Sequence, residues 1–337
     1  MLFHFTAMPT FFIGFDISKL TLDVAVLKDA TLLQTRKIDN SESAIKQLLV
    51  ALKSSHHCTP DNTIYCAEYM GLYRKFLTDV LIRKQARLCL ESPLRIRLSL
   101  GIQRGKSDVL DAIRIAEYAQ KNAATLKFWT PPRPPVEKLK TLMSIRKKLT
   151  KMSSMLKNTK KLESYFLSES SRKDIGVYTR STFQAIKADI DVIEREMTDI
   201  INLDTHLHNL MQVMTSVPNI GKIIATEIII LTNEFKDISC PKKFSSYCGI
   251  APFARTSGTT LKGKPKVSHM ANKDMKKNLH LASLGATRRG QTLFKTYYER
   301  KVKEGKNKMS VLNAIRNKLV RVIFACVREN KLYEEPA

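Results

Sequence analysis

The chain has 337 residues, 43% of them hydrophobic, and its 57 lysines and arginines outnumber its 31 acidic residues, which gives a formal net charge of +26. The hydrophobic content is enough to build cores and excludes a disordered basic tail. The charge and a pI near 9.9 favour nucleic acid as the partner over acidic proteins or a membrane surface, because no basic amphipathic anchor stands out.

The first 130 residues predict an α/β domain. Apolar residues alternate with the period of a strand over 11–17 and 22–27, and a third strand is predicted at 31–38. Helices and strands then alternate. The predicted elements are a helix capped by Ser41, a strand ending at Glu68, a helix through Tyr73, Phe76, Leu77, Val80 and Leu81, a strand over 86–90 and a helix over 107–122 capped by Ser107. This order is typical of a ribonuclease-H-like fold.

Four carboxylates stand at informative places in these elements. Asp16 lies within the first strand, Glu68 closes the strand before the second helix, and Asp108 and Asp111 open the helix over 107–122. A ribonuclease-H-like fold uses such a strand–strand–helix set of acids to hold hard divalent cations. Mg²⁺ prefers oxygen ligands, and two ions about 3.5–4 Å apart can clamp the attacking and leaving oxygens of a phosphodiester. The sequence therefore predicts a Mg²⁺ site, with Mn²⁺ as the alternative ion.

The prolines in Pro131-Pro132-Arg133-Pro134-Pro135 predict a stiff spacer and a domain boundary. The region 136–212 then predicts two long helices, whose apolar residues recur at alternating spacings of 3 and 4, as in a coiled coil or an antiparallel helix pair. The first seam is Leu142, Ile145, Leu149, Met152 and Leu156, and the second runs from Ile186 to Met211. Lysines on the first helix, including Lys147 and Lys148, are equally compatible with a solvated face and with nucleic-acid contact.

The segment Ser216-Val217-Pro218-Asn219-Ile220-Gly221-Lys222 joins two predicted helices. A Pro-x-x-Gly turn of this kind resembles a helix-hairpin-helix, whose backbone N–H groups bind a DNA phosphate without reading sequence. Asn219, Gly221 and Lys222 are therefore candidate nucleic-acid contacts. A plain helical turn is the alternative.

The C-terminal part carries much of the positive charge, with 24 lysines and arginines against nine acids from residue 217 onward. A loop is predicted from Arg255 through Ser257-Gly258 to Lys262-Gly263-Lys264-Pro265-Lys266, where basic groups and glycines suit close approach to phosphate. A basic helix is predicted over 271–289, with Lys273, Lys276 and Lys277 facing nucleic acid and Met275, Leu279, Leu281 and Leu284 facing a core. The final helix, 308–329, is predicted as core with Arg316, Lys318 and Arg321 pointing outward.

Taken together, these motifs resemble the DEDD insertion-sequence transposases, a family that includes the Piv site-specific DNA invertase and the bridge-RNA-guided recombinases. The resemblance covers nearly the whole chain. Its matching segments are Gly14-Phe15-Asp16-Ile17-Ser18-Lys19, Ala67-Glu68, Lys106-Ser107-Asp108-Val109-Leu110-Asp111-Ala112, Val217-Pro218-Asn219-Ile220-Gly221, Phe244 through Pro252, Ser257-Gly258 and the basic helix after Val267-Ser268.

The resemblance implies three regions: a RuvC-like DEDD catalytic domain over 1–130, a proline linker with coiled-coil helices over 131–212, and a mostly helical transposase domain with a helix-hairpin-helix and a serine loop over 213–337. It implies that Asp16, Glu68, Asp108 and Asp111 bind Mg²⁺. Ser257, a weak candidate by spacing alone, matches the family's serine nucleophile, which forms a covalent phosphoserine link with DNA.

The same resemblance implies donor and target DNA as partners, a structured bridge RNA that supplies sequence choice by base pairing, and a dimer or tetramer. It places the protein in the cytoplasm of a bacterium or archaeon, associated with the nucleoid. No apolar run of about 18 residues predicts a membrane helix, and the six cysteines lack Cys-x-x-Cys pairs and are expected to be reduced thiols.

The chain departs from the family pattern in two places. A glycine that usually precedes the basic helix is missing from His269-Met270-Ala271-Asn272-Lys273-Asp274, and the usual arginines are replaced by Lys276, Lys277 and His280. Lysines hold phosphate as point charges and lack the bidentate fork of arginine.

Three alternatives stay open: an invertase without an RNA guide, a Holliday-junction resolvase-like hydrolase that uses an activated water, and a non-catalytic nucleic-acid-binding protein. In the last case the acids would be helix caps and edge-strand charges.

Overall fold

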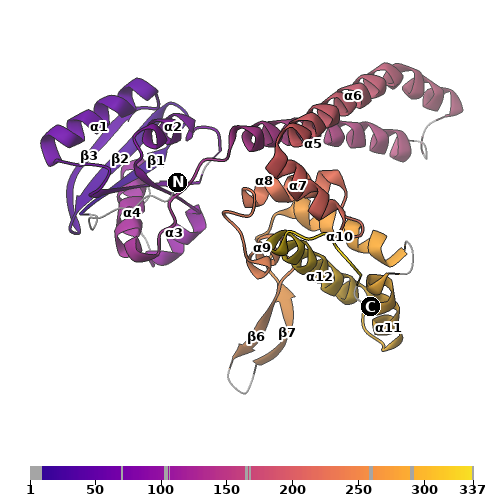
Figure 1. Cartoon of the computed structure of the whole chain (residues 1–337). Helices are drawn as coiled ribbons and strands as arrows, with labels where there is room; N and C mark the ends of the chain where they lie inside the picture. Colours follow the sequence, from indigo (N-terminus) through magenta and orange to yellow (C-terminus); the bar gives the residue numbers. More distant parts are fainter. Residues whose placement is uncertain are drawn as a thin grey trace. The chain divides into compact units, whose positions relative to one another are not determined.

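The structure is a computed structural model that describes residues 10–69, 71–101, 105, 107–163, 166, 168–257, 261–288 and 292–335. Within these ranges, the side chains of 158–163, 171–172, 255–257, 261, 262 and 264 are not described. The chain divides into two compact units, Met1–Pro131 and Pro132–Ala337 (Figure 1). The boundary falls within the predicted proline spacer.

The first unit is built on a five-stranded mixed sheet with the order β3-β2-β1-β4-β5. β1 (Phe11–Ile17), β2 (Thr21–Lys28) and β3 (Thr31–Asp39) form an antiparallel meander. β4 (Thr63–Glu68) and β5 (Arg87–Glu91) extend it, with β4 parallel to β1 and β5 parallel to β4.

Helices cover both faces of this sheet. α1 (Glu42–His56) and α2 (Lys75–Arg83) pack on the face that receives Ile13 and Phe15. α4 (Asp108–Lys121) and the short α3 (Pro93–Ser99), which the sequence did not predict, cover the face that receives Phe12. Because both faces are covered, β1 is a nearly continuous apolar run rather than a clean alternation. The mixed sheet flanked by helices fits the expected ribonuclease-H-like domain.

Two serines begin helices of this unit as predicted. The Ser41 hydroxyl accepts a hydrogen bond from the backbone N–H of Ala44 at 3.3 Å, and the Ser107 hydroxyl accepts one from Leu110 at 3.2 Å. The predicted helix through Tyr73 differs in its start: α2 begins only at Lys75, and the side chains of Tyr73 and Phe76 are 49% and 47% exposed. Leu77, Val80 and Leu81 of that helix are buried.

The second unit begins with two long helices, α5 (Pro134–Glu163) and α6 (Glu169–Leu203), which pack against each other (Figure 1). Pro134 and Pro135 form the first turn of α5 instead of continuing an extended spacer, because proline is tolerated at a helix start. The predicted α5 seam is not buried along its length, since Ile145 and Met152 are 42% and 51% exposed. Among the described side chains of α5, the buried ones are Val136, Leu139 and Met143, so a coiled-coil seam is not confirmed.

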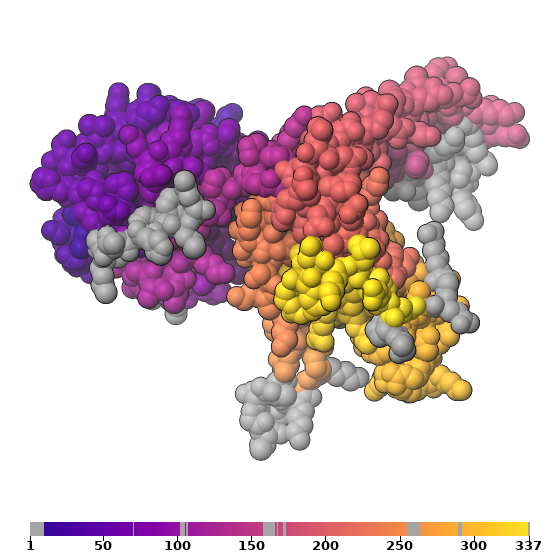
Figure 2. Space-filling view, in the orientation of Figure 1, coloured from indigo at the N-terminus to yellow at the C-terminus, as the bar shows by residue number. Residues whose placement is uncertain are grey.

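The remaining helices of this unit form one core with the base of the long helices. They are α7 (Thr205–Thr215), α8 (Lys222–Thr232), α9 (Pro241–Tyr247), α10 (Lys273–Arg288), α11 (Leu293–Lys303) and α12 (Lys308–Glu329). A hairpin of β6 (Pro252–Ser257) and β7 (Leu261–Val267) lies between α9 and α10 in the chain. In the space-filling view, the segments from α7 to α12 form a continuous mass from which α5 and α6 project (Figure 2).

Arg133 attaches the start of the second unit to this core. Its guanidinium donates two hydrogen bonds to Asp204, at 2.7 and 3.0 Å, and further bonds to Glu234, whose side chain is fully buried. Asp204 follows the last residue of α6 and accepts a hydrogen bond from the backbone N–H of Leu207 at the start of α7. One arginine therefore joins the chain before α5 to the ends of α6 and α8.

Three predictions for the C-terminal part were wrong. The expected loop around Ser257 is an antiparallel hairpin in which Ser257 pairs with Leu261. Arg316 is not outward-facing, because it is only 6% exposed and lies against His280. Leu281, expected in the core of α10, is 55% exposed, whereas Ala282 and Ala286 are buried. No helix in the described part of the chain is long and apolar enough to cross a membrane.

Candidate catalytic site

The parallel pairing of β1 and β4 brings the first two predicted acids to one edge of the sheet. Phe15 pairs with Ala67, so Asp16 and Glu68 follow directly on neighbouring strands. In a strand, residues an even number of positions apart point to the same face. Asp16 therefore shares a face with Phe12, and Glu68 with Cys66, and both Phe12 and Cys66 pack on α4. The side chains of Asp16 and Glu68 are therefore directed to the face that α4 covers.

Gly14 allows α4 to approach this edge closely. A Cβ atom added at Gly14 would stand 2.2 Å from the carbonyl oxygen of Ala112 and 2.5 Å from the nitrogen of Ala116. Only glycine leaves room for the helix backbone to lie on β1 at this point. The contact fixes the first turn of α4, with Asp108 and Asp111, near the end of β1.

The four predicted acids interact electrostatically. Burial raises the pKa of Asp16 to about 6, with further contributions from the carboxylates of Asp108, Asp111 and Asp23. Burial, followed by Asp16 and Asp111, also raises the pKa of Glu68. A bound cation would reduce the repulsion among these neighbouring carboxylates.

Hard divalent ions prefer an all-oxygen donor set such as these acids provide. The described residues nevertheless contain no group of three or more histidine, cysteine or acidic side chains spaced to hold a metal ion. In α4, Arg114 donates a hydrogen bond of 2.9 Å to Asp111 Oδ1. The donor chemistry of the four acids fits Mg²⁺.

Two further acids of this edge were missed in the sequence. Asp23 pairs in register with Asp16, is 3% exposed, and lies 3.5 Å from Lys37 Nζ. Glu91 pairs in register with Glu68, but it accepts hydrogen bonds from Arg95 at 3.0 Å and from the Tyr118 hydroxyl at 2.8 Å. An aspartate inside the apolar run of β2 was the available signal for Asp23.

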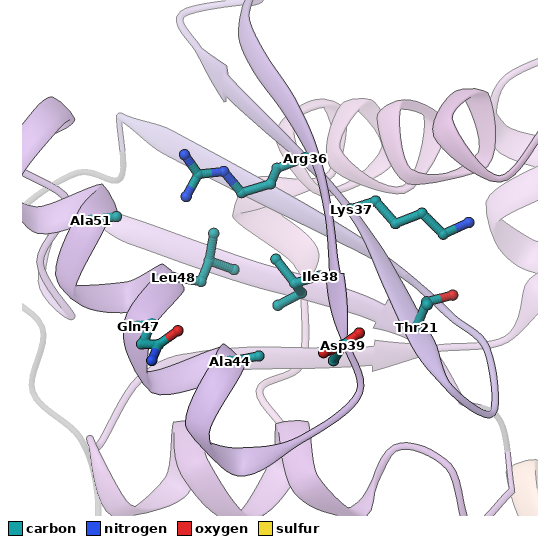
Figure 3. A pocket seen from close by; sticks show the side chains of 9 residues that line it. All are labelled: Thr21, Arg36, Lys37, Ile38, Asp39, Ala44, Gln47, Leu48 and Ala51. Carbon is teal, nitrogen blue, oxygen red and sulfur yellow. The ribbon is translucent and has the colours of Figure 1, made fainter.

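Two cavities flank the edge strand β3. The larger, of about 560 Å³, lies between β3 and α1, and none of the four predicted acids lines it; Figure 3 shows Arg36 and Lys37 leaving the strand in opposite directions. The smaller, of about 350 Å³, is lined by Asp23, Lys37 and Asp108 among others. Only the smaller cavity therefore adjoins the acidic site.

The predicted helix-hairpin-helix turn joins α7 to α8, but a phosphate-binding role is not confirmed for it. Asn219 has a left-handed backbone with φ of 64°. Its side chain packs against Gly285 of α10, where an added Cβ would stand 2.5 Å from Asn219 Oδ1. Asn219 therefore has a structural task, whereas Gly221 and Lys222 are exposed at the N-terminus of α8.

The remaining predicted contacts lie on the β6–β7 hairpin and α10. Arg255, Ser257, Lys262 and Lys264 belong to the hairpin strands, but their side chains lie outside the described part; Gly258 lies outside it altogether. Lys266, Lys273 and Lys277 are exposed, and Lys276 is half-buried. Lys266 near the end of the hairpin and Lys273 and Lys277 in the first turns of α10 thus present positive charge to solvent.

The turn before α10 is formed without the family's glycine. Asn272 Oδ1 accepts from the backbone N–H of Met275 at 3.0 Å and so caps α10. Gly249, with φ of 63°, lies so close to Ala271 that an added Cβ would stand 2.3 Å from the Ala271 Cβ. The close packing of Gly249 holds this turn.

Lys147 was predicted to lie on a solvated face or to contact nucleic acid, but it is part of an internal ion pair. Its ammonium bonds to Glu227 of α8, whose side chain is 2% exposed, and lies 3.3 Å from Asp274 of α10. Burial alone would lower the pKa of Lys147, but the bonds to these acids raise it overall. Asn278 donates a further bond of 2.6 Å to Glu227, so Lys147 joins α5 to the core.

Known proteins resemble both units of the chain. A family model described as "Transposase", of the DEDD IS110 group, matches residues 13–167, and a model described as "Transposase IS116/IS110/IS902 family" matches residues 211–299. The chain is 24% identical to the pilin gene-inverting protein of Moraxella bovis, over 97% of this chain and 99% of that protein.

Two shorter matches accompany these. An uncharacterized 43.6 kDa protein of insertion element IS110 from Streptomyces coelicolor is 27% identical over 40% of this chain and 33% of that protein. A solved structure of T. thermophilus RuvC in complex with Holliday junction substrate aligns with 36% of this chain and 99% of that chain, at 12% identity and a TM-score of 0.30. The two family models and the full-length relative together show that the chain belongs to the IS110 family of transposases, enzymes that recombine DNA by cutting and rejoining its strands.

Proposed function

We propose that the chain cuts and rejoins DNA through divalent metal ions held by Asp16, Glu68, Asp108 and Asp111 together with Ser257 as nucleophile. The observation that carries the metal part is the position of the acids: Asp16 and Glu68 end neighbouring parallel strands, and Gly14 lets the first turn of α4 lie against β1. Burial, and then the neighbouring carboxylates, raises the pKa of Asp16 to about 6. Bound Mg²⁺ or Mn²⁺ would supply charge neutralisation at the phosphodiester undergoing reaction.

The proposed covalent step involves Ser257. Its hydroxyl oxygen attacks the phosphorus of a DNA phosphodiester, the bond from phosphorus to one deoxyribose oxygen breaks, and that oxygen leaves with a proton. A hydroxyl at the end of another strand later attacks the phosphoserine and releases the serine. Support for this role comes from the match of Ser257-Gly258 to the family motif and from the exposed lysines 266, 273 and 277 near the hairpin.

The proposed partners are donor DNA, target DNA and a structured RNA encoded beside the gene, bound by a dimer or tetramer of the chain. The formal charge of +26 suits the neutralisation of several phosphate backbones. In this proposal the protein contacts nucleic-acid backbones, and base pairing with the RNA selects the sequences. The packing of Asn219 on α10 limits its side chain's access to nucleic acid. The proposed nucleic-acid contacts are Asn219, Gly221, Lys222, Arg255, Lys262, Lys264 and Lys276.

A second candidate function is site-specific DNA inversion without an RNA guide. The observation that favours it is the alignment of nearly the whole chain with a protein named for inverting a pilin gene. Sequencing of nucleic acid that co-purifies with the protein, expressed beside its flanking DNA, separates the two candidates. A single RNA from the flank supports the guided reaction, whereas heterogeneous nucleic acid supports the invertase.

The experiment that tests the chemistry compares Ser257→Ala with Ser268→Ala, a nearby serine whose hydroxyl accepts from the N–H of Met270. Labelled DNA is incubated with each protein and Mg²⁺, and covalent adducts are separated under denaturing conditions. We expect adducts with the wild type and Ser268→Ala and none with Ser257→Ala, while DNA binding persists in all three. Adducts in Ser257→Ala would contradict the serine assignment, and cut DNA without attached protein would support a hydrolase.

A further inference from the structure

The loop that follows Glu68, together with the first turn of α2, exposes large apolar side chains on the α2 side of the sheet. Tyr69 directly follows Glu68 and is 51% exposed, and Tyr73 is 49% exposed. Leu72 and Phe76 are 87% and 47% exposed. Large apolar side chains that gather on a solvent-exposed surface mark an interaction site.

Hydrogen bonds hold the backbone of the two tyrosines. The N–H of Tyr69 donates to the carbonyl of Glu91 at 2.7 Å, which attaches Tyr69 to the end of β5. The Asn40 side chain, 9% exposed, donates to the carbonyls of Ser18 and Tyr73, both at 2.9 Å. Tyr69 is thereby attached to β5 and Tyr73 to the β1–β2 turn, which reduces the ordering that a ligand would have to impose on these two residues.

An arginine supports the ring of Tyr69. The Arg74 guanidinium carbon lies 4.4 Å from the centre of the Tyr69 ring and 5.3 Å from that of Trp129. Its Nε donates to the Gly71 carbonyl at 3.3 Å, while Nη1 is buried without a hydrogen-bond partner. No ion pair between Arg74 and an acid occurs in the described chain, so its positive charge is directed at two aromatic rings.

Aromatic rings backed by a cation fit a nucleobase. Every base offers a π-face for stacking, and arginine adds cation–π attraction. The β1–β2 turn, which Asn40 joins to the loop, contributes the exposed Lys19 and Leu20, the latter 75% exposed. A lysine at the rim suits the phosphate of a nucleotide whose base lies on the rings, and the +26 charge of the chain favours nucleic acid here over a second protein surface.

We propose that Tyr69, with Tyr73 beside it, stacks an unpaired base of the DNA strand bound at the carboxylate site. The inference rests on the proposed function only in placing DNA at Asp16 and Glu68. Strand exchange must separate paired bases near the phosphate that is cut, and a ring that stands one residue after Glu68, on the α2 side of the sheet, and is backed by Arg74 can hold such a base out of its duplex.

The test uses the full-length protein with Ca²⁺, a hard cation that carboxylates bind in place of Mg²⁺, and a single-stranded oligonucleotide that contains 2-aminopurine. Stacking on tyrosine quenches 2-aminopurine fluorescence. Tyr69→Phe keeps the ring and should bind within about twofold of the wild type. Tyr69→Leu keeps an apolar side chain without a ring and should bind about 5- to 150-fold more weakly, with the quenching lost.

The matched control is Tyr178→Leu, a tyrosine of α6 that is 79% exposed and should leave binding and quenching unchanged. Circular dichroism checks the fold, and if Tyr69→Leu is unfolded, Tyr73→Leu must show reduced quenching instead. Unchanged binding and quenching in folded Tyr69→Leu would overturn the proposal. Dissociation of that variant to a smaller oligomer in analytical ultracentrifugation would also overturn it, because the surface would then be a contact between copies of the chain.

The design separates this proposal from the proposed function. Retained DNA cutting by Asp16→Asn would refute the metal site and leave the stacking result intact. Loss of the stacking effect alone, with adducts still formed by the wild type, would refute only the role of Tyr69.

Discussion

Gly14 of β1 lies directly against the backbone of Ala112 in α4, since a Cβ added at Gly14 would stand 2.2 Å from the Ala112 carbonyl oxygen. This contact sets the distance between the strand that carries Asp16 and the helix that carries Asp108 and Asp111. The geometry of the acids therefore depends on a residue that has no side chain to take part in chemistry.

Gly14→Ala should lower the free energy of unfolding of the first unit by about 1–3 kcal/mol, because the new methyl group must displace helix backbone rather than a flexible side chain. Urea unfolding checks this. Gly221→Ala is the control, since no atom lies within 4 Å of its added Cβ, and its cost should stay under about 1 kcal/mol, the scale of an N-cap preference. Equal effects of the two substitutions would contradict the close packing of α4.

The raised pKa of Asp16 predicts a pH-dependent stability. Unfolded Asp16 ionises near 3.8, whereas the folded side chain keeps its proton up to about 6. The folded state binds more protons between these values, so stability should fall as pH rises from about 4 to about 6. Asp16→Asn should reduce this slope, leaving the smaller contribution of Glu68, and should stabilise the metal-free protein at pH 7 by about 1–2 kcal/mol, after allowance for solvent screening.

Thermal unfolding at several pH values in EDTA checks the Asp16 prediction. Asp39→Asn, an exposed aspartate of β3, is the control and should keep the slope of the wild type. Addition of Mg²⁺ at pH 7 should raise the Tm of the wild type but not that of Asp16→Asn. A Mg²⁺ response that survives in Asp16→Asn would argue against a metal held by this acid.

Arg133→Gln should destabilise the second unit by about 2–4 kcal/mol, because it leaves the fully buried Glu234 with less compensation. The hydrogen bonds from Arg133 to Asp204 hold the pKa of Asp204 at about 2, below its ordinary value. The stabilisation from this pair should therefore be lost in the wild type as pH falls from about 4 toward 2 and Asp204 becomes protonated. Lys138→Gln, which breaks an exposed pair with Glu196, should cost under about 1 kcal/mol. Denaturant unfolding that gives equal losses would contradict the anchoring role of Arg133.

Lys147→Gln and Lys148→Gln should separate structural from nucleic-acid-binding lysines on α5. Lys147 neutralises the buried Glu227, so its loss should reduce stability by about 2–4 kcal/mol. Lys148 is exposed, and its loss should leave stability unchanged within about 0.5 kcal/mol. Denaturant unfolding measures both, and an unchanged stability of Lys147→Gln would show that the pair with Glu227 contributes little.

Local patterns in the sequence were enough for most elements of the first unit. The strands over 11–17 and 22–27, the serine caps and the helix that starts at Asp108 follow from residue spacing and capping chemistry, which act within a few residues. The positions of Asp16, Glu68, Asp108 and Asp111 at the ends of these elements were equally visible. The fold class of the first unit followed because three strands, and then alternating helices and strands, can pack in few arrangements.

Tertiary packing decided what these local patterns left open. Whether Tyr73 is core or surface depends on where α2 begins, and whether Lys147 or Arg316 meets solvent depends on which helix lies against it. Asp23 joined the acids only through its register with Asp16, and Glu234 received Arg133 from 101 positions away in the chain. The sequence by itself determined where strands, helices and acids occur, because those signals are local. Only the tertiary structure decided which charges are buried and paired, because burial is set by contacts between residues far apart in the chain.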